Sequence, residues 1–180
     1  VAAVPVDVTD EESVKNMVAA TTREFGRIDI FFNNAGMTTP LYRVDETPVS
    51  EWDKVIGTNL RGSFMCLKYV IKAMLPAKKG SIINISSIAG LRAEIPEMGP
   101  AAYGASKAAI INLTQVAAME YAKDGIRVNC IAPGAHNTEL GHNPGDPPLD
   151  AEALRERQKF LGEYCAAEVP MGRFGEPGEL

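Results

Sequence analysis

The sequence predicts an α/β fold, a doubly wound parallel sheet of the Rossmann-like kind. Helix-like and strand-like segments alternate along its 180 residues. The strand-like segments, such as "IDIFF" and "GSIINI", are apolar throughout, so both faces of their sheet need a cover of helices. The stretches "NNAG", "NISS" and "IAPG" stand at the ends of three strands, where parallel sheets form their ligand sites.

The first half of the chain reads as strand, helix, strand and helix. We expect "VAAVPVDV" at 1–8 to be a strand. Thr9 or Asp10 can cap the next helix, which Gly26 ends. The apolar positions of this helix follow helical spacing: Val14, Met17, Val18, Thr21 and Phe25. After the strand "IDIFF", one long helix is predicted over 52–75.

The second half continues the alternation. The strand "GSIINISS" is followed by a helix over 103–122 and by the strand "IRVNCIAPG". A polar loop rich in proline and glycine follows at 137–150, and an amphipathic helix at 151–166. We therefore expect one domain over 1–180, with the segment 137–166 inserted in it as a substrate loop or lid.

Composition and charge narrow the class of protein. Hydrophobic residues make up 46% of the chain, yet no apolar run approaches the roughly 18 residues of a membrane span. The net charge is −5 without a basic patch, which argues against nucleic-acid binding. Three sparse cysteines, Cys66, Cys130 and Cys165, lack the spacing of a disulfide framework or of metal ligands. We expect a cytoplasmic protein with no membrane partner and no metal site.

Tyr103 and Lys107 are four residues apart on a predicted helix and therefore share one face. A phenol has a pKa near 10 and is a poor base at neutral pH, but a nearby ammonium favours the phenolate. Lowering that pKa by three units takes about 4 kcal/mol, which a partly desolvated lysine can largely supply. Acid–base catalysis works best when the pKa lies near the working pH, so this pair is a candidate catalytic unit.

Two further polar residues belong with this pair. Ser87 offers a hydroxyl to a substrate oxygen at the end of its strand. Asn59 lies on the apolar face of a helix, where a buried amide needs hydrogen-bond partners. It either satisfies local backbone groups or anchors a water that links Lys107 to solvent.

The motifs "NNAG", Asn59, "NISS", "YGASK" and "IAPG", in this order, resemble the short-chain dehydrogenase/reductase family over essentially the whole chain. The "NNAG" form resembles its ordinary short-chain branch. The resemblance implies hydride transfer between NAD or NADP and a secondary alcohol or ketone. It makes Tyr103 the general acid/base and Lys107 its activator and a ligand of the nicotinamide ribose. Ser87 would hold the substrate oxygen, and Asn59 would support the proton relay.

The resemblance also implies a set of cofactor contacts. Asp7 would bond the adenine and Val8 would line its pocket. The adenosine half would lie against the residues of the "NNAG" motif: Asn33, Asn34, Ala35 and Gly36. Pro133, Gly134 and Thr138 would bracket the nicotinamide. His136 stands where an aliphatic residue often contacts the nicotinamide, and it either contacts a polar substrate or packs locally.

Some family features are absent from these 180 residues. The resemblance implies a fold truncated at both ends, with its first two strands and glycine-rich phosphate loop before Val1 and its last strand after Leu180. The pyrophosphate normally binds that loop, so we expect the intact protein to be active and the fragment alone to be inactive. The intact protein is expected to form a homodimer or homotetramer through the helices at 52–75 and 103–122.

Three alternatives remain open. The chain could be a catalytically silent fragment, or a binding or scaffold protein with the same fold. It could also be a hydrolase in which Lys107 activates Ser87, although no nucleophile-elbow motif is present.

Overall fold

A computed structural model describes residues 1–93, 100–137 and 150–179 of the chain. The chain forms two compact units, Val1–Ala132 and Pro133–Leu180, and each is described by itself. None of the described helices combines the length and apolar character needed to cross a membrane.

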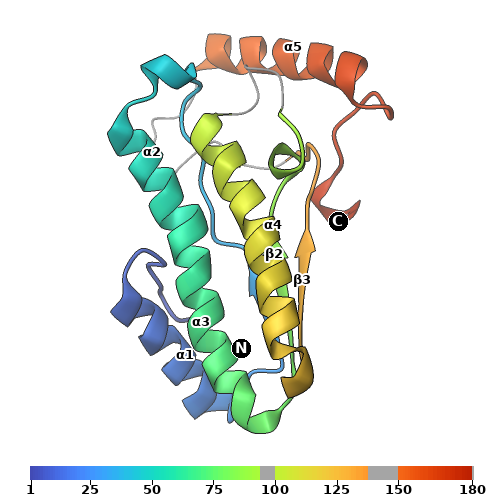
Figure 1. Ribbon diagram of the computed structural model, residues 1–180. Coiled ribbons are helices and arrows are strands. Elements are labelled where there is room, and N and C mark those ends of the chain that lie inside the picture. The colour runs from blue at the N-terminus through green and yellow to red at the C-terminus, as the bar shows by residue number, and fades with distance from the viewer. Residues whose placement is uncertain (94–99, 138–149, 180) are drawn as a thin grey trace. The chain divides into compact units, whose positions relative to one another are not determined.

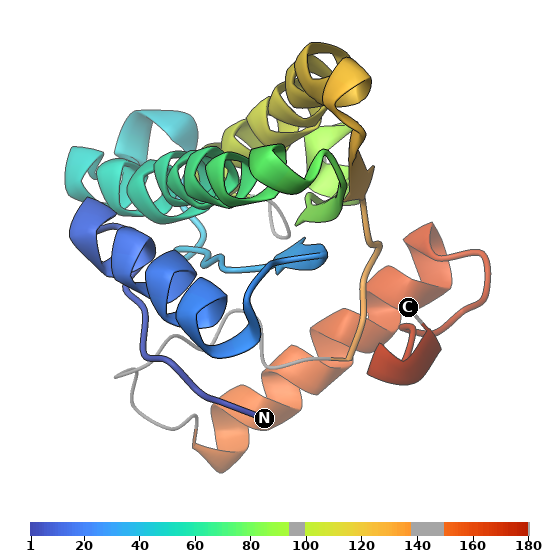
Figure 2. The ribbon, with the colours of Figure 1, turned by 90° about the horizontal axis from the view of Figure 1, so that it is seen from below.

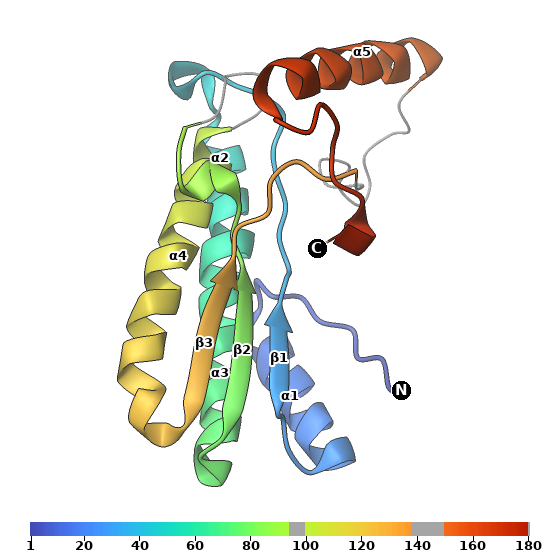
Figure 3. The same cartoon turned by 90° about the vertical axis from the view of Figure 1, so that its right-hand side faces the viewer.

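The first unit is built on a parallel sheet of three strands in the order β1-β2-β3 (Figures 1 and 3). The strands are β1 (Ile30–Asn33), β2 (Gly80–Ile85) and β3 (Ile126–Ile131). Its helices are α1 (Glu11–Phe25), α2 (Val49–Val55), the π-helix η2 (Ile56–Gly62), α3 (Ser63–Met74) and α4 (Ala101–Tyr121). Short 3-10 turns complete it: η1 (Val44–Glu46), η3 (Leu75–Ala77), η4 (Ile88–Gly90) and η5 (Ala122–Asp124). The predicted α/β class and parallel sheet are confirmed.

Helices α1, α3 and α4 lie side by side on one face of this sheet (Figure 2). Their apolar sides and the inward strand residues form the core, which includes Val70, Met74, Ile82, Ile126 and Val128. On the opposite face, Ile30 and Phe32 of β1 remain 69% and 51% exposed. The apolar strands predict a sheet with helices on both faces. The described helices of this unit cover one of these two faces.

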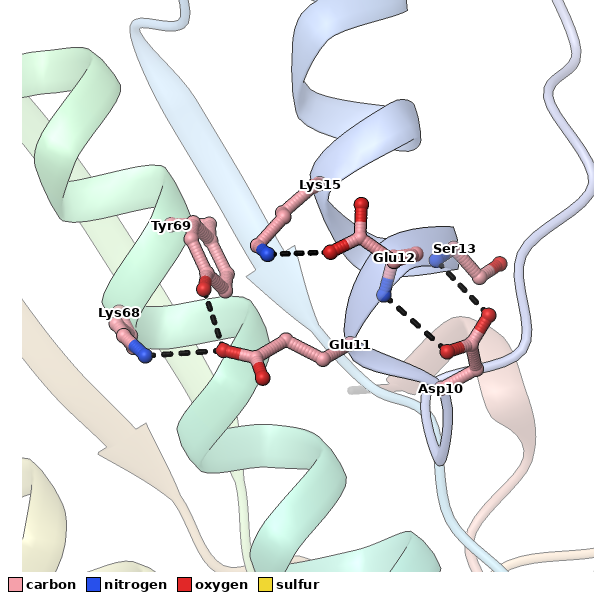
Figure 4. A network of polar contacts seen from close by, with 7 residues as sticks. All are labelled: Asp10, Glu11, Glu12, Ser13, Lys15, Lys68 and Tyr69. Carbon is pink, nitrogen blue, oxygen red and sulfur yellow. Dashed lines mark hydrogen bonds and ion pairs between the residues drawn. The ribbon is translucent and has the colours of Figure 1, made fainter.

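Helix α1 begins and ends where the sequence predicts. The Asp10 carboxylate accepts hydrogen bonds from the backbone N–H groups of Glu12 and Ser13 (Figure 4). Gly26 ends the helix in the left-handed region with φ 78°, which suits glycine. At the same end of α1, Glu11 accepts hydrogen bonds from the Tyr69 hydroxyl and, at 3.0 Å, from Lys68 Nζ on α3. The Tyr69 and Lys68 bonds lower the pKa of Glu11 to about 2.

Two elements differ from the prediction. Residues 1–7 form no strand, because no neighbouring strand in the described part of the chain offers them hydrogen-bond partners. The helix predicted over 52–75 starts earlier, at Val49, and contains the π-helix Ile56–Gly62 in its middle. Periodicity alone does not distinguish such a π segment from an α-helix, because a single wide turn barely disturbs the apolar face.

The second unit contains helix α5 (Ala151–Glu168) and the 3-10 turn η6 (Pro177–Glu179). The helix predicted over 151–166 is therefore confirmed. An isolated parallel bridge joins His136 to Gly175, and the ring centroids of Tyr164 and Phe174 lie 6.3 Å apart. Most of the predicted loop at 137–150 lies outside the described residues.

Candidate active site at the carboxyl end of the sheet

Lys107 is fixed to the end of strand β2 by both its side chain and its backbone. It is only 4% exposed, and its Nζ donates a 2.9 Å hydrogen bond to the carbonyl oxygen of Ile85. In return, the buried Ser86 Oγ donates a 2.7 Å bond to the Lys107 carbonyl oxygen. Burial lowers the pKa of Lys107 to about 8. The ammonium is thus buried, held in one place, and still mostly protonated at pH 7.

Tyr103 lies one helical turn before Lys107 on α4 and is partly exposed. The Lys107 Nζ is 5.5 Å from the centroid of the Tyr103 ring. The two side chains therefore share a face, as their i, i+4 spacing predicts. A phenol that is reachable from solvent, with a buried cation beside its ring, is suited to exchange a proton with a bound molecule.

Ser87 stands between the end of β2 and η4, and this segment packs on the same turn of α4. A β-carbon added at Gly90 would lie 2.6 Å from the carbonyl carbon of Lys107. One added at Gly104 would lie 3.2 Å from the carbonyl oxygen of Ala89. Only glycine at position 90 allows so close an approach, since a side chain there would overlap the backbone of α4. The glycines therefore bring the Ser87 segment against the turn that carries Tyr103 and Lys107.

The hydrogen bonds of Ser87 and Lys107 lead to different partners. Ser87 Oγ accepts a 3.2 Å bond from the Ala89 N–H, whereas Lys107 Nζ donates to Ile85. In the described residues no bond joins Ser87 to Lys107, so the geometry offers no support for a serine–lysine hydrolase.

Asn59 is fully buried in the π-helix η2 and is held by three hydrogen bonds. Its Oδ1 accepts from the Met37 N–H at 2.8 Å, and its Nδ2 donates to the Met37 carbonyl oxygen at 2.9 Å. Its second N–H is donated to Ser106 Oγ at 3.1 Å. Both amide hydrogens are thus used within the protein, which supports the local-bonding interpretation of this side chain. The water relay remains a prediction, and the Asn59 side-chain amide has no hydrogen left to donate to it.

The "NNAG" residues divide into a buried asparagine and an exposed loop. Asn33 is 4% exposed and donates to Ser63 O at 3.1 Å and to Asn84 Oδ1 at 3.0 Å, so its side chain serves the core. The three following residues are exposed: Asn34, Ala35 and Gly36. A β-carbon at Gly36 would lie 3.5 Å from both Asn59 Oδ1 and Lys107 Nζ. The loop therefore reaches the Lys107 ammonium, and any adenosine contact falls to its exposed residues.

Asp7 and Val8 lie at the entry to α1. Asp7 Oδ1 accepts hydrogen bonds from the N–H and hydroxyl of Thr9, and these bonds lower the pKa of Asp7. Val8 packs on η2, because a β-carbon at Gly62 would lie 2.8 Å from Val8 Cγ2. Their adenine contacts remain predictions.

In the second unit, the His136 ring packs locally. Its Nδ1 lies 3.0 Å from the Gly134 carbonyl oxygen, and a β-carbon at Gly175 would lie 2.7 Å from its Nε2. This favours the packing alternative for His136. The nicotinamide contacts predicted for Pro133 and Gly134 remain predictions, and Thr138 lies outside the described residues.

One polar atom in the site region was not anticipated from the sequence. Thr39, three residues after Gly36, is 6% exposed, and its Oγ1 has no hydrogen-bond partner in the described part of the chain. The sequence offered no signal for it, because Asn59, which holds the neighbouring Met37, lies 22 residues further along the chain. A buried hydroxyl of this kind normally has a hydrogen-bond partner.

The residues present fit a nicotinamide cofactor. Gly36 lacks a side chain next to the Lys107 ammonium, which leaves a cradle that a ribose hydroxyl can enter. The ammonium has hydrogens beyond the one given to Ile85, so it can also donate to such a hydroxyl.

Known proteins resemble the chain over nearly all of its length. A levodione reductase from Leifsonia aquatica is 40% identical over 174 residues, which are 97% of this chain and 62% of that protein. The solved structure of ElxO with NADP bound matches with a TM-score of 0.78 and 33% identity, over 95% of this chain and 64% of that one. An NAD+-bound xylitol dehydrogenase matches with a TM-score of 0.77 and 37% identity, over 95% and 66%.

The chain spans 61% to 65% of the length of the curated relatives it matches first. Residues 1–147 match the family model described as short chain dehydrogenase. This match includes the strand ends, Asn59, Ser87, Tyr103 and Lys107, whose geometry is given above. The chain belongs to the short-chain dehydrogenase family.

Proposed function

We propose that the chain is the catalytic part of an oxidoreductase that transfers a hydride between NAD or NADP and a secondary alcohol or ketone. One observation carries the proposal. A buried ammonium, Lys107, is clamped to the end of β2 with its Nζ 5.5 Å from the ring of the partly exposed Tyr103. The cofactors of ElxO and xylitol dehydrogenase support the choice of NAD or NADP.

The bound cofactor supplies or accepts the hydride, and this chain's residues manage the proton. In the reducing direction, the Tyr103 hydroxyl gives its proton to the carbonyl oxygen as the hydride reaches the carbonyl carbon, so an alcohol results. Lys107 stabilises the phenolate that is left. In the oxidising direction, Tyr103 takes the alcohol proton. Ser87 donates a hydrogen bond to the substrate oxygen and orients it toward Tyr103.

The exposed residues 34–36 and the pair Asp7 and Val8 would hold the adenosine half of the cofactor, and Lys107 would bind its nicotinamide ribose. The family resemblance assigns the nicotinamide to Pro133, Gly134 and Thr138, of which Thr138 lies outside the described residues. Asn59 holds the loop that ends at Met37. Its two hydrogen bonds to the Met37 backbone support this role.

Two measurements test this function. NAD(H) and NADP(H) are titrated into the 180-residue chain by calorimetry, and we expect no micromolar binding in the absence of a pyrophosphate loop. Ketone reduction is then assayed with the chain alone and with any longer protein that carries it. Turnover that is equal in the wild type and in Tyr103→Phe would refute the proposed chemistry.

We further propose a homodimer or homotetramer formed through α3 and α4, in a cytoplasmic protein. Apolar side chains on these helices support the contact, since Phe64, Val116 and Met119 are 47%, 45% and 83% exposed. All three cysteines are free, which suits a reducing compartment. Light scattering of Met119→Glu tests the contact: the variant should have a smaller mass than the wild type.

A further inference from the structure

Ser106 joins two parts of the site that are distant in sequence. It is fully buried on α4 between Tyr103 and Lys107. Its hydroxyl accepts the 3.1 Å bond from Asn59 Nδ2 and donates a 2.7 Å bond to the backbone oxygen of Tyr103. The sequence showed Ser106 only as one small residue among several.

The direction of these two bonds makes Ser106 a specific partner for Asn59. A serine hydroxyl has one hydrogen and two lone pairs. Because its hydrogen is given to the Tyr103 carbonyl, the rotor is fixed and a lone pair faces the Asn59 amide. Serine bonds to the preceding turn of a helix are common. The added bond from an amide of another helix is the feature that calls for an explanation here.

Through Asn59 the connection reaches the loop after β1. Asn59 binds both the N–H and the carbonyl oxygen of Met37, so four groups form one chain of bonds. We call the chain Met37–Asn59–Ser106–Tyr103 the site relay. We infer that Ser106 is a positioning residue: it keeps the Asn59 amide seated on the cofactor loop and couples that loop to the turn that carries Tyr103. The effect on turnover rests on the proposed function, whereas the effect on the loop does not.

The same helix provides a matched control. The buried Thr114 hydroxyl accepts a 2.9 Å bond from Asn84 Nδ2 and donates a 2.7 Å bond to the Ile110 carbonyl oxygen. We call the chain Asn33–Asn84–Thr114–Ile110 the core relay, because Asn33 continues it to Ser63 in the core. Thr114 makes the same two kinds of bond as Ser106 and lies eight residues, about 12 Å, further along α4.

Hydrogen exchange of the Met37 amide, followed by NMR on the full chain, tests the inference directly. Ser106→Ala leaves one Asn59 N–H without its acceptor, so we expect Met37 to exchange about tenfold faster. In Thr114→Val, the Met37 amide should exchange at the wild-type rate. The exchange rates of Ser106→Ala and Thr114→Val are compared under conditions that give the two variants the same free energy of unfolding. If Ser106→Ala does not fold, Ser106→Cys replaces the hydroxyl with a weak acceptor of similar size, and the same change is expected. Unchanged Met37 exchange would overturn the inference.

The second measurement is turnover. It is made in an active preparation for which Tyr103→Phe has been shown to abolish activity, so that the activity measured depends on Tyr103. There, Ser106→Ala should lower kcat about tenfold and leave KM within twofold, because substrate contacts are kept while the alignment of Tyr103 is lost. Ser106→Thr, which keeps the hydroxyl, should recover most of that kcat. Equal kcat in Ser106→Ala and Thr114→Val would overturn the positioning role. Activity that survives Tyr103→Phe would instead refute the proposed function and leave the exchange result standing.

Discussion

The site relay and the core relay use the same chemistry for different ends. In each, an asparagine amide is donated to a hydroxyl on α4 whose own hydrogen goes to the helix backbone. The core relay continues to Asn33 and Ser63, groups that are themselves buried. The site relay continues to Met37, in a loop whose preceding residues are exposed.

This difference shows that burial alone does not identify a structural residue. Asn59 and Asn84 are almost equally buried, at 0% and 1% exposed, and the side-chain amide of each donates to a hydroxyl on α4. What separates them is the far end of each chain of bonds. One end is fixed in the core, and the other holds a loop beside Lys107, where a β-carbon added at Gly36 would lie 3.5 Å from the ammonium nitrogen.

The largest effect is expected at Tyr103, whose backbone oxygen ends the site relay. Tyr103→Phe removes the hydroxyl that we propose carries the proton, so kcat should fall on the order of 10²- to 10⁴-fold. The free energy of unfolding should fall by no more than about 1 kcal/mol, the usual contribution of one hydrogen bond, because the ring and its contact with Lys107 remain. Steady-state kinetics and urea denaturation measure the two quantities. If the free energy of unfolding fell by as much as the activation free energy calculated from kcat rose, Tyr103 would be a core residue instead.

Lys107 should give the next largest effect, on the pH dependence of stability. Its folded pKa of about 8 lies below the value of 10.5 for an exposed lysine. Between these values the unfolded state binds more protons, so stability should rise as the pH increases from 8 to 10.5, by about 3 kcal/mol in total. In Lys107→Met this rise should be absent. The free energy of unfolding of the variant, relative to that of the wild type, should be highest below pH 8.

Urea denaturation of both proteins at pH 7, 8, 9 and 10 checks this expectation. Parallel stability curves for the wild type and Lys107→Met would show that Lys107 is not desolvated in the folded protein.

Breaking the core relay should affect stability without a specific effect on the site. Asn84→Ala leaves one amide hydrogen of Asn33 without its acceptor and the Thr114 hydroxyl without the amide that donates to it. An unsatisfied buried group costs about 1–3 kcal/mol, so the free energy of unfolding should fall by roughly that amount. Met37 exchange, corrected for global stability, should not change. Faster Met37 exchange would mean that the two relays are one network.

The sequence predicted the members of these networks unevenly. Helix α1 was located from Asp10 and Gly26, because caps act through local backbone geometry. The partnership of Tyr103 with Lys107 followed from their spacing on one helix. The role of Ser106 could not be predicted, since its partner Asn59 is 47 residues away and their contact depends on how α4 packs on η2. The expected strand at 1–8 was wrong because a strand depends on a neighbour that its own residues do not specify.

The smallest effect is expected from a third polar network, which lies at the surface. Glu11 accepts bonds from Tyr69 and Lys68 between α1 and α3, and its carboxylate pKa is lowered to about 2 (Figure 4). A lowered carboxylate pKa contributes stability above the unfolded value near 4.5, and this contribution is lost as the pH falls toward 2. Glu11→Gln should therefore be slightly less stable than the wild type at pH 7 and equal to it near pH 2. Because the Glu11 side chain is partly exposed, salt should reduce this difference, whereas salt should leave the Asn84→Ala effect unchanged. Thermal unfolding in low and high salt compares the two variants, and a salt-independent loss in Glu11→Gln would show that this contact behaves like the buried relays.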